Sequence, residues 1–418
     1  MASYSKTLIT AIEFGTCKIT VMNGKSDENN MPEVISFAQA SSECSVVKGQ
    51  IVDISKVEAI LRKLLKEADE SLTETPEGRI FFVTVNGGQV HSFLRSGTLQ
   101  LNPSETITAQ IAQEAMEKAG ANVIRNGEQV FSRYDAYFKL DDDKITGSPV
   151  GLQSSQLEAF MRYYTVRAST LSEIHSCLQR IGFDNEIHYV FNGIASVFGT
   201  LNDDEMSQGV LLIDLGHGCT DYVLVHGNGV LASGVIPVGI ANVANDLHIG
   251  LEMPYEQCEL LVRNSKYSEL LAQGGHFYEY VMEKDKKRLI PLESFEAVVN
   301  ARLSEIFELI YKEIEEDGLF SYMPNGVVLC GGCAAIKEIE SVVKNVFKSP
   351  IRIGKPLPFS GANSSFTDAP SSYTAIHGLL RCALAGITDK RLPGMDFLRN
   401  KLESLVDSVM SFRKALSK

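Results

Sequence analysis

Hydrophobic residues along this 418-residue chain follow two patterns, and together the patterns predict an α/β protein. Continuous apolar runs that end at glycine or polar turns predict buried strands at residues 8–12, 80–85 and 210–213. Apolar residues spaced by three and four predict long helices at residues 54–70 and 294–316. The same spacing predicts shorter helices at residues 170–181, 192–201, 241–248, 255–266 and 373–385.

The segment 86–165 differs in character from its surroundings, and we interpret it as an inserted α+β subdomain. Strand-like stretches at 91–101, 134–140 and 161–166 accompany a helix predicted at 104–119, with Asn102 and Pro103 as its start signal. We assign residues 1–85 and 166–200 to a first domain, to which the chain returns at 356–385. Residues 201–355 form a second domain with a helical part near 240–315, and residues 386–396 form a linker.

The hairpin predicted at residues 209–225 contains the first candidate ligand-binding residues. Its first strand ends at the carboxylate Asp214, and Gly216 and Gly218 follow in the turn. Glycines leave backbone N–H groups open to a ligand, which favours an anion such as phosphate. The adjacent carboxylate suits a hydrated Mg²⁺ ion. An ordinary hairpin with a polar turn is the alternative interpretation.

A second hairpin of the same order is predicted at residues 8–22. An apolar run leads to Glu13, then to Gly15 and Thr16, and then to a second strand. Lys18 stands where it could reach a phosphate, although a surface lysine is an equal alternative. Two such hairpins in one chain predict two similar domains that face one cleft, with Glu13 and Asp214 as candidate metal ligands.

A third glycine element lies at residues 326–336, where a strand is predicted to run into Gly331 and Gly332 and then into a helix. Such a loop would place a helix N-terminus against a nucleotide. The three elements together resemble the nucleotide site of the superfamily of actin, sugar kinases and Hsp70, which implies ATP and Mg²⁺ as cofactors. Cys330 and Cys333 also match a metal or redox spacing, but burial beside a glycine turn is the preferred interpretation.

Composition limits the possible partners and compartments. The net charge of −13 argues against general nucleic-acid binding, because phosphate backbones repel an acidic surface. The sequence has no secretory signal and no apolar run of the roughly 18 residues that a membrane span requires. Eight cysteines without disulfide-like spacing suggest a reducing cytoplasm.

Residues 397–418 predict an amphipathic helix with a locally basic polar face. Such a segment could bind an anionic membrane surface. The alternatives are a terminal helix packed on the body of the protein and a coil that binds a partner. The apolar stripe and the candidate membrane-facing cations are Leu398, Leu402, Leu405, Val409, Phe412, Leu416, Arg413 and Lys414.

The order of these motifs resembles that of the bacterial cell-division family FtsA over essentially the whole chain. The motifs that carry the resemblance are AIEFGTCK, KGQIVD, SPVGL, NGIASVFGTL, GVLLIDLGHGCTDYVLV, GVIPVG, LCGGCAAI and RIGKP. The resemblance implies an actin-like two-domain fold, ATP binding, self-association into filaments and attachment of the terminal helix to the cytoplasmic side of the membrane at the division site. It also implies capture of the tail of the tubulin-like protein FtsZ near Arg288 and Arg302, and contacts with other division proteins through the inserted subdomain.

Several positions depart from the pattern of such nucleotide sites. His217 and Cys219 stand where a glycine and a threonine are usual, and Ile240 follows Gly239 where a second glycine is expected. Of the purine-site pair, Glu259 remains and Val262 replaces the lysine. These changes imply weakened nucleotide binding and at most weak ATP hydrolysis. The alternatives are an ATPase or phosphotransferase of the same fold and a pilus-assembly protein of related fold.

Overall fold

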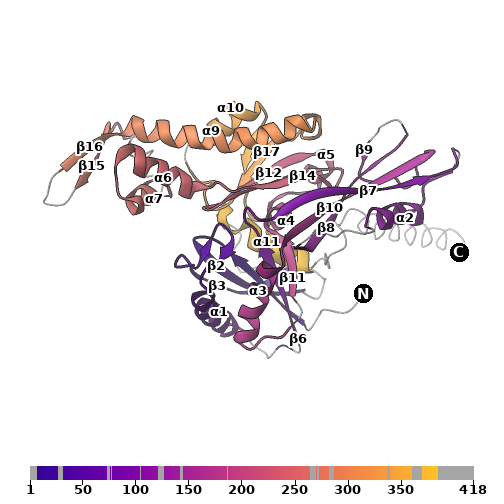
Figure 1. Ribbon diagram of the computed structural model, residues 1–418, viewed down its shortest axis with the longest axis horizontal. Coiled ribbons are helices and arrows are strands. Elements are labelled where there is room, and N and C mark those ends of the chain that lie inside the picture. Colours follow the sequence, from indigo (N-terminus) through magenta and orange to yellow (C-terminus); the bar gives the residue numbers. More distant parts are fainter. Residues whose placement is uncertain are drawn as a thin grey trace, which may run out of the picture.

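Two five-stranded sheets of the same topology form the frame of the molecule (Figure 1). The structure is a computed structural model, which describes residues 7–26, 32–72, 76, 78–103, 105–120, 127–141, 145–185, 187–263, 270, 273–281, 287–336, 339–359 and 370–384. The first sheet has the order β11-β6-β1-β2-β3 and contains β1 (Thr7–Phe14), β2 (Lys18–Ser26), β3 (Pro32–Ser41), β6 (Gly78–Val85) and β11 (Ile187–Phe191). The second has the order β14-β13-β12-β17-β18 and contains β12 (Val210–Leu215), β13 (Thr220–His226), β14 (Gly229–Ile236), β17 (Val327–Cys330) and β18 (Ile351–Ile353).

Each sheet is an antiparallel three-stranded meander extended by two parallel strands. In the first sheet β1 pairs antiparallel with β2 and parallel with β6, and in the second β12 pairs antiparallel with β13 and parallel with β17. The predicted pair of similar hairpins is therefore present, and each hairpin occupies the equivalent place in its sheet. The strands β12 and β17 are buried throughout, as their continuous apolar runs require.

Two helices lie between the sheets and join the two lobes. Helix α4 (Asn192–Thr200) is buried along its whole length and packs on β12 and β13, while α11 (Thr374–Leu384) packs on β1, β2 and β6. The two helices meet at Gly199 and Gly378, where an added Cβ would collide with the backbone of the other helix. This close approach requires glycine at both positions.

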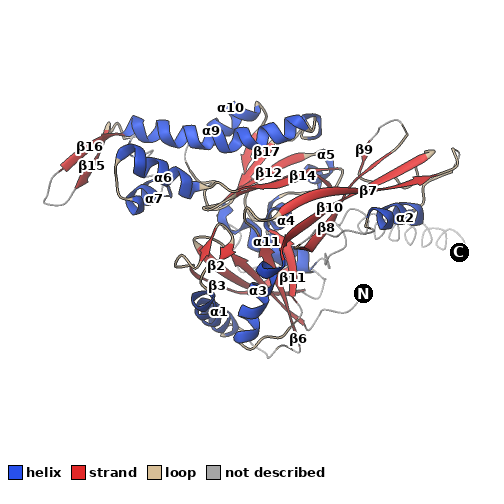
Figure 2. Cartoon of the chain, viewed as in Figure 1, coloured by secondary structure: helices blue, strands red, loops and turns tan. Residues whose placement is uncertain are grey.

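The outer helices (Figure 2) each bury one apolar face and largely match the predicted ranges. On the first lobe, α1 (Ile54–Asp69) buries Val57, Leu61 and Leu64, and its N-cap Asp53 accepts the amide of Lys56. Nearby elements are α3 (Ala168–Arg180) and the short hairpin β4 (Val46–Val47) and β5 (Gln50–Ile51), whereas α5 (Asp203–Gln208) packs on β13 of the second sheet.

On the second lobe, the long helix α9 (Leu292–Glu316) buries one of its sides, which carries Phe295, Val299, Leu303, Ile306 and Ile310. The helical part of this lobe also contains α6 (Ile240–Leu251), α7 (Tyr255–Arg263) and the hairpin β15 (Phe277–Val281) and β16 (Lys287–Pro291).

The inserted subdomain has its own sheet and core. Strands β7 (His91–Gln100), β8 (Glu128–Lys139), β9 (Ile145–Thr146) and β10 (Gln156–Arg167) form a sheet of order β7-β10-β8-β9, against which α2 (Ala109–Ala119) packs. The buried guanidinium of Arg162 donates to the carbonyls of Val230 and Leu231 in β14, so it ties the subdomain to the second sheet.

Three sequence predictions about element boundaries were wrong. Helix α2 begins after the N-cap Thr108 rather than at residue 104, because Thr106 pairs with Gln153 in extended conformation. No helix directly follows the double glycine, since turns occupy residues 331–336 and α10 begins only at Ile339 (α10, Ile339–Phe347). Strand β8 also starts six residues before the predicted segment at 134–140.

The fold class inferred from the sequence is confirmed for the two lobes and the insert. The linker predicted at 386–396 and the amphipathic helix predicted at 397–418 lie outside the described residues. The exact domain limits remain predictions. Among the described helices, none combines the length and the apolar character needed to cross a membrane.

Candidate nucleotide-binding site

A cavity of about 310 Å³ lies where the two lobes meet. Both hairpin turns, the double glycine and the start of α11 form its walls. The structure brings together in this cavity most of the residues predicted from sequence, namely Glu13, Gly15, Thr16, Lys18, Asp214, Gly216, Gly218, Gly331 and Gly332. Its volume is at the lower end of the range typical of small-molecule pockets, about 300–1,000 Å³.

The two hairpin turns have the same backbone geometry. The amide of Gly15 donates to the carbonyl of Lys18 at 2.9 Å, and the amide of Gly216 donates to the carbonyl of Cys219 at 3.0 Å. The turns approach each other so closely that a Cβ added at Gly218 would lie 2.7 Å from the Thr16 Oγ1. The cavity therefore has a matched glycine turn on each lobe.

The double glycine completes the wall beside Asp214. Gly331 has a φ of +95°, and an added Cβ there would collide with the Asp214 carboxylate. Glycine is thus required at this position by conformation and by space. Gly332 is different, since the nearest atom to an added Cβ is the Ser372 Cβ at 3.8 Å.

Buried carboxylates dominate the electrostatics of the cavity. Asp214 is the last residue but one of β12 and accepts hydrogen bonds from Ser196 Oγ at 2.5 Å and from Asn192 Nδ2 at 3.4 Å. Asp221 stands directly opposite Asp214 in the β12–β13 register and accepts a bond from the same Asn192 amide at 2.7 Å. Burial raises the pKa of Asp214, and burial together with the Asp214 charge raises the pKa of Asp221 to about 8.

Glu13 and Lys18 provide the other charges. Burial raises the pKa of Glu13 to about 7, although the Lys18 ammonium group opposes the shift. The Lys18 Nζ donates to the carbonyl of Ser372 at 3.0 Å and lies 3.8 Å from the centre of the Tyr373 ring. Lys18 is therefore held at the cavity wall rather than extended into solvent.

Three oxygens at this site are suited to a hydrated cation. Glu13 Oε2, Asp221 Oδ1 and Asn192 Oδ1 are buried and have no hydrogen-bond partner. The water shell of Mg²⁺ supplies donors to such acceptors, and carboxylates are its usual protein ligands. The donor set of the cavity thus fits Mg²⁺ held through water.

Sequence reasoning missed Asn192, Ser196 and Asp221. Asn192 and Ser196 lie on the cavity side of α4, in a motif whose individual residues gave no chemical signal. Asp221 could have been found from the hairpin itself, because pairing the strands about the turn at 216–219 places it opposite Asp214. Two acids facing each other in an otherwise apolar hairpin indicate a cation site, since like charges across a strand pair are destabilising.

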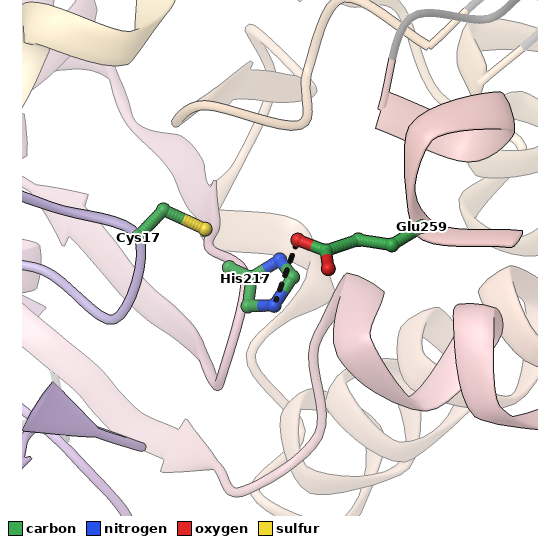
Figure 3. Close-up of side chains that lie close together, drawn as sticks. All are labelled: Cys17, His217 and Glu259. Carbon is green, nitrogen blue, oxygen red and sulfur yellow. Dashed lines mark ion pairs between the residues drawn. The ribbon is translucent and has the colours of Figure 1, made fainter. Parts of the chain in front are cut away.

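Gly239 and Glu259 do not line the main cavity. Gly239 lies behind the second turn, and the amides of Ile240 and Ala241 donate to the carbonyls of Gly216 and His217 at 3.2 and 2.9 Å. The first amides of α6 therefore hold the turn in place. Glu259 on α7 faces His217 instead, with 3.7 Å between its Oε1 and the His217 Nε2 (Figure 3).

The two arginines predicted to bind a partner lie in the helical part of the second lobe, away from this cavity. Arg302 on α9 is already paired, because its guanidinium reaches Asp246 at 2.6 and 3.0 Å and Glu305 at 2.5 Å. Arg288 on β16 is held more weakly, at 3.5 Å from the Glu252 carboxylate. Of these two arginines, Arg288 is therefore the one that could exchange its ion-pair partner at a low cost in free energy.

The paired sheets, the helices between them and the glycine-lined cleft define an actin-like protein. Solved structures show the same fold: a PilM–PilN type IV pilus biogenesis complex has a TM-score of 0.62 at 12% identity and covers 91% of this chain and 99% of that chain. MreB5 of Spiroplasma citri bound to ADP has a TM-score of 0.52 at 13% identity and covers 92% of this chain and 99% of that chain.

Sequence comparisons point to one family within this fold. A family model described as cell division protein FtsA matches residues 211–376. The FtsA protein of Borreliella burgdorferi is 26% identical over 87% of this chain and 88% of its own length. That of Pseudomonas aeruginosa is 24% identical over 85% and 84%, and that of Bacillus subtilis is 25% identical over 84% and 79%. The resemblance to bacterial FtsA is therefore confirmed.

Replacing Asp221 with asparagine should stabilise the cation-free protein, with a gain that grows with pH. The folded protein retains a proton on Asp221 up to about pH 8, whereas the unfolded chain releases it near the ordinary value of 3.8. Stability therefore falls as pH rises between these values, and Asp221→Asn removes this contribution. We expect a gain of at least about 1.4 kcal/mol at pH 8, the equivalent of one pKa unit, and a smaller one at pH 5.

The measurement is urea unfolding in EDTA at pH 5 and pH 8, with exposed Asp184→Asn as the matched control. A gain that is equal at both pH values, or a loss at pH 8, would show that the Asp214–Asp221 pair is not a source of strain.

Proposed function

We propose that this protein is a membrane-associated, ATP-binding, actin-like scaffold of bacterial cell division, which polymerises and tethers the FtsZ ring to the cytoplasmic membrane. The observation that carries the proposal is the cleft with its matched glycine turns, in a chain that resembles FtsA over most of its length. The homology supports the division role, and the geometry of the cleft supports nucleotide binding.

The nucleotide would lie between the two hairpins. Backbone amides at Gly15, Thr16, Gly216 and Gly218 would contact its phosphates, and the open space beside Gly332 would accept the rest. Lys18 would add a positive charge near the phosphates. Solved MreB5 structures of this fold, described as bound to ADP and to AMPPNP, support nucleotide binding in the same architecture.

Mg²⁺ would neutralise the phosphates when it is bound, which is the chemistry that this ion supplies. Asp214, Glu13 and Asp221 would hold it through water, and Asn192 would orient the two aspartates. We assign the chain at most weak hydrolysis, because His217 and Cys219 replace residues that such sites normally use, and burial raises the pKa of Cys219.

A pilus-assembly role is the second candidate, and the likeness to the PilM–PilN complex favours it. A pilus protein has no use for FtsZ capture or for a basic amphipathic terminal helix. Recruitment of FtsZ to vesicles therefore separates the two proposals.

Replacing Leu405 and Phe412 with glutamate should abolish membrane attachment. The predicted helix 397–418 would lie flat in the headgroup layer, and each buried apolar side chain would contribute roughly 1.5–3 kcal/mol. The double variant places charge in the apolar stripe, so co-sedimentation with anionic vesicles should be lost, together with co-sedimentation of added FtsZ.

The matched control is Ser404→Glu with Ser411→Glu, which adds the same charge on the polar face of the same helix. Binding of the control should be retained more strongly than that of the apolar-stripe variant. Equal vesicle binding by both folded variants and the parent protein would rule out the helix as the anchor.

Reversing the charge of Arg288 should weaken capture of the acidic FtsZ tail by about 10-fold or more, since a charge-assisted hydrogen bond contributes roughly 1.5–3 kcal/mol. Arg288→Glu breaks only the long contact to Glu252, whereas a change at Arg302 would also break its short bonds to Asp246. Lys312→Glu, an exposed charge elsewhere on the helical part, is the control. Fluorescence anisotropy with the tail peptide would detect the difference, and equal affinities would exclude Arg288 from the interface.

A further inference from the structure

Cys17, His217 and Glu259 converge at the edge of the cleft. Their ligand atoms, the Sγ, a ring nitrogen and a carboxylate oxygen, all lie within 4.8 Å of one another. Figure 3 shows the Cys17 thiol and the Glu259 carboxylate pointing toward the His217 ring from opposite sides. Among the described residues this is the only group of three such ligands that comes together.

The three residues come from three separate parts of the fold. Cys17 lies in the β1–β2 turn of the first lobe, His217 in the β12–β13 turn of the second lobe, and Glu259 on α7 of the helical part. All three are partly buried, with side-chain exposure of 13% for His217 and 24% for Glu259. The site is therefore shielded but still open to a small ion.

We propose that Cys17, His217 and Glu259 bind a Zn²⁺ ion that bridges the two lobes, with water in the fourth position. Thiolate, imidazole and carboxylate are the three ligand types that zinc uses in proteins. Tetrahedral coordination at zinc bond lengths of about 2.0–2.3 Å places ligand atoms roughly 3.3–3.6 Å apart. The His217–Glu259 separation of 3.7 Å is close to this range, and the separations from the Cys17 Sγ, which are at most 4.8 Å, would shorten on binding.

The neighbouring groups support this ligand set over others. Cys219 is in the same turn as His217, but its thiol is not among the ligand atoms that lie within 4.8 Å of one another. Mg²⁺ prefers oxygen ligands, which are found deeper in the cleft at Asp214 and Glu13. The two sites thus differ in ligand chemistry, although Cys17 and His217 line the same cavity as Asp214 and Glu13.

A metal at this position would have a mechanical effect. Because its ligands belong to both lobes, the ion would favour the closed cleft and resist opening. This inference does not depend on the proposed function, since it requires neither nucleotide nor FtsZ.

The test uses the full-length protein, stripped of metal and free of nucleotide. Competition with a chromophoric chelator would measure Zn²⁺ affinity and stoichiometry, and Co²⁺ substitution would report a thiolate-to-cobalt charge-transfer band. The variants are Cys17→Ser, His217→Gln and Glu259→Gln, each checked for folding by circular dichroism. The matched control is His91→Gln, which breaks a second histidine–glutamate pair, His91–Glu128 at 3.5 Å, on the inserted subdomain.

We expect one tight Zn²⁺ per chain, an increase in thermal stability on binding, and a cobalt charge-transfer band that Cys17→Ser removes. Each ligand variant should weaken zinc binding by roughly 100-fold or more, because even outer-shell partners of a metal contribute about 10–100-fold, and the control should match the parent. The proposal is wrong if the cobalt complex lacks the thiolate band, or if folded Cys17→Ser and His217→Gln bind zinc as the parent does.

Discussion

The contact between α4 and α11 is the constraint on which the rest of the structure depends. Gly199 and Gly378 let the two backbones touch, so a single thin helical layer separates the sheets of the two lobes. The same contact fixes the cavity side of α4, where Asn192 and Ser196 hold the aspartates. It also fixes the start of α11, and in the turn just before this helix the carbonyl of Ser372 accepts a hydrogen bond from the Lys18 ammonium group. Side chains at either glycine would separate the helices and move both walls of the cleft.

This arrangement leaves the cleft with buried acids and few positive charges. Asn192 and Ser196 supply neutral donors, and Lys18 is the cation close to Glu13 and Asp214. The raised pKa values of Glu13 and Asp221 are the electrostatic consequence. A cleft of this kind gains stability when cations enter it, which connects the packing of the core to our proposals of Mg²⁺ between the hairpins and Zn²⁺ at the edge.

Much of the fold could be predicted from sequence, because buried strands and amphipathic helices leave strong periodic signals. The hairpin of β12 and β13 and the helices α1 and α9 are examples. The start of α2 and the turns after Gly332 were missed, because an isolated strand pairing and tertiary packing decided them. At the site, the glycines of the turns, Glu13 and Asp214 were predicted, and Asp221 was missed although the hairpin register places it opposite Asp214. Asn192, Ser196 and Cys17 depend on contacts between segments distant in sequence.

Nucleotide binding between the two hairpins is the central claim, and isothermal titration calorimetry with Mg·ATP tests it most directly. Gly332→Asp would place a negative charge in the cavity without a steric clash, and Gly250→Asp, at an open position on α6, is its matched control. The parent and Gly250→Asp proteins should bind Mg·ATP alike, and Gly332→Asp should bind at least about 10-fold more weakly because of like-charge repulsion. Absence of heat from the folded parent at millimolar Mg·ATP, or equal binding by all three proteins, would contradict the account.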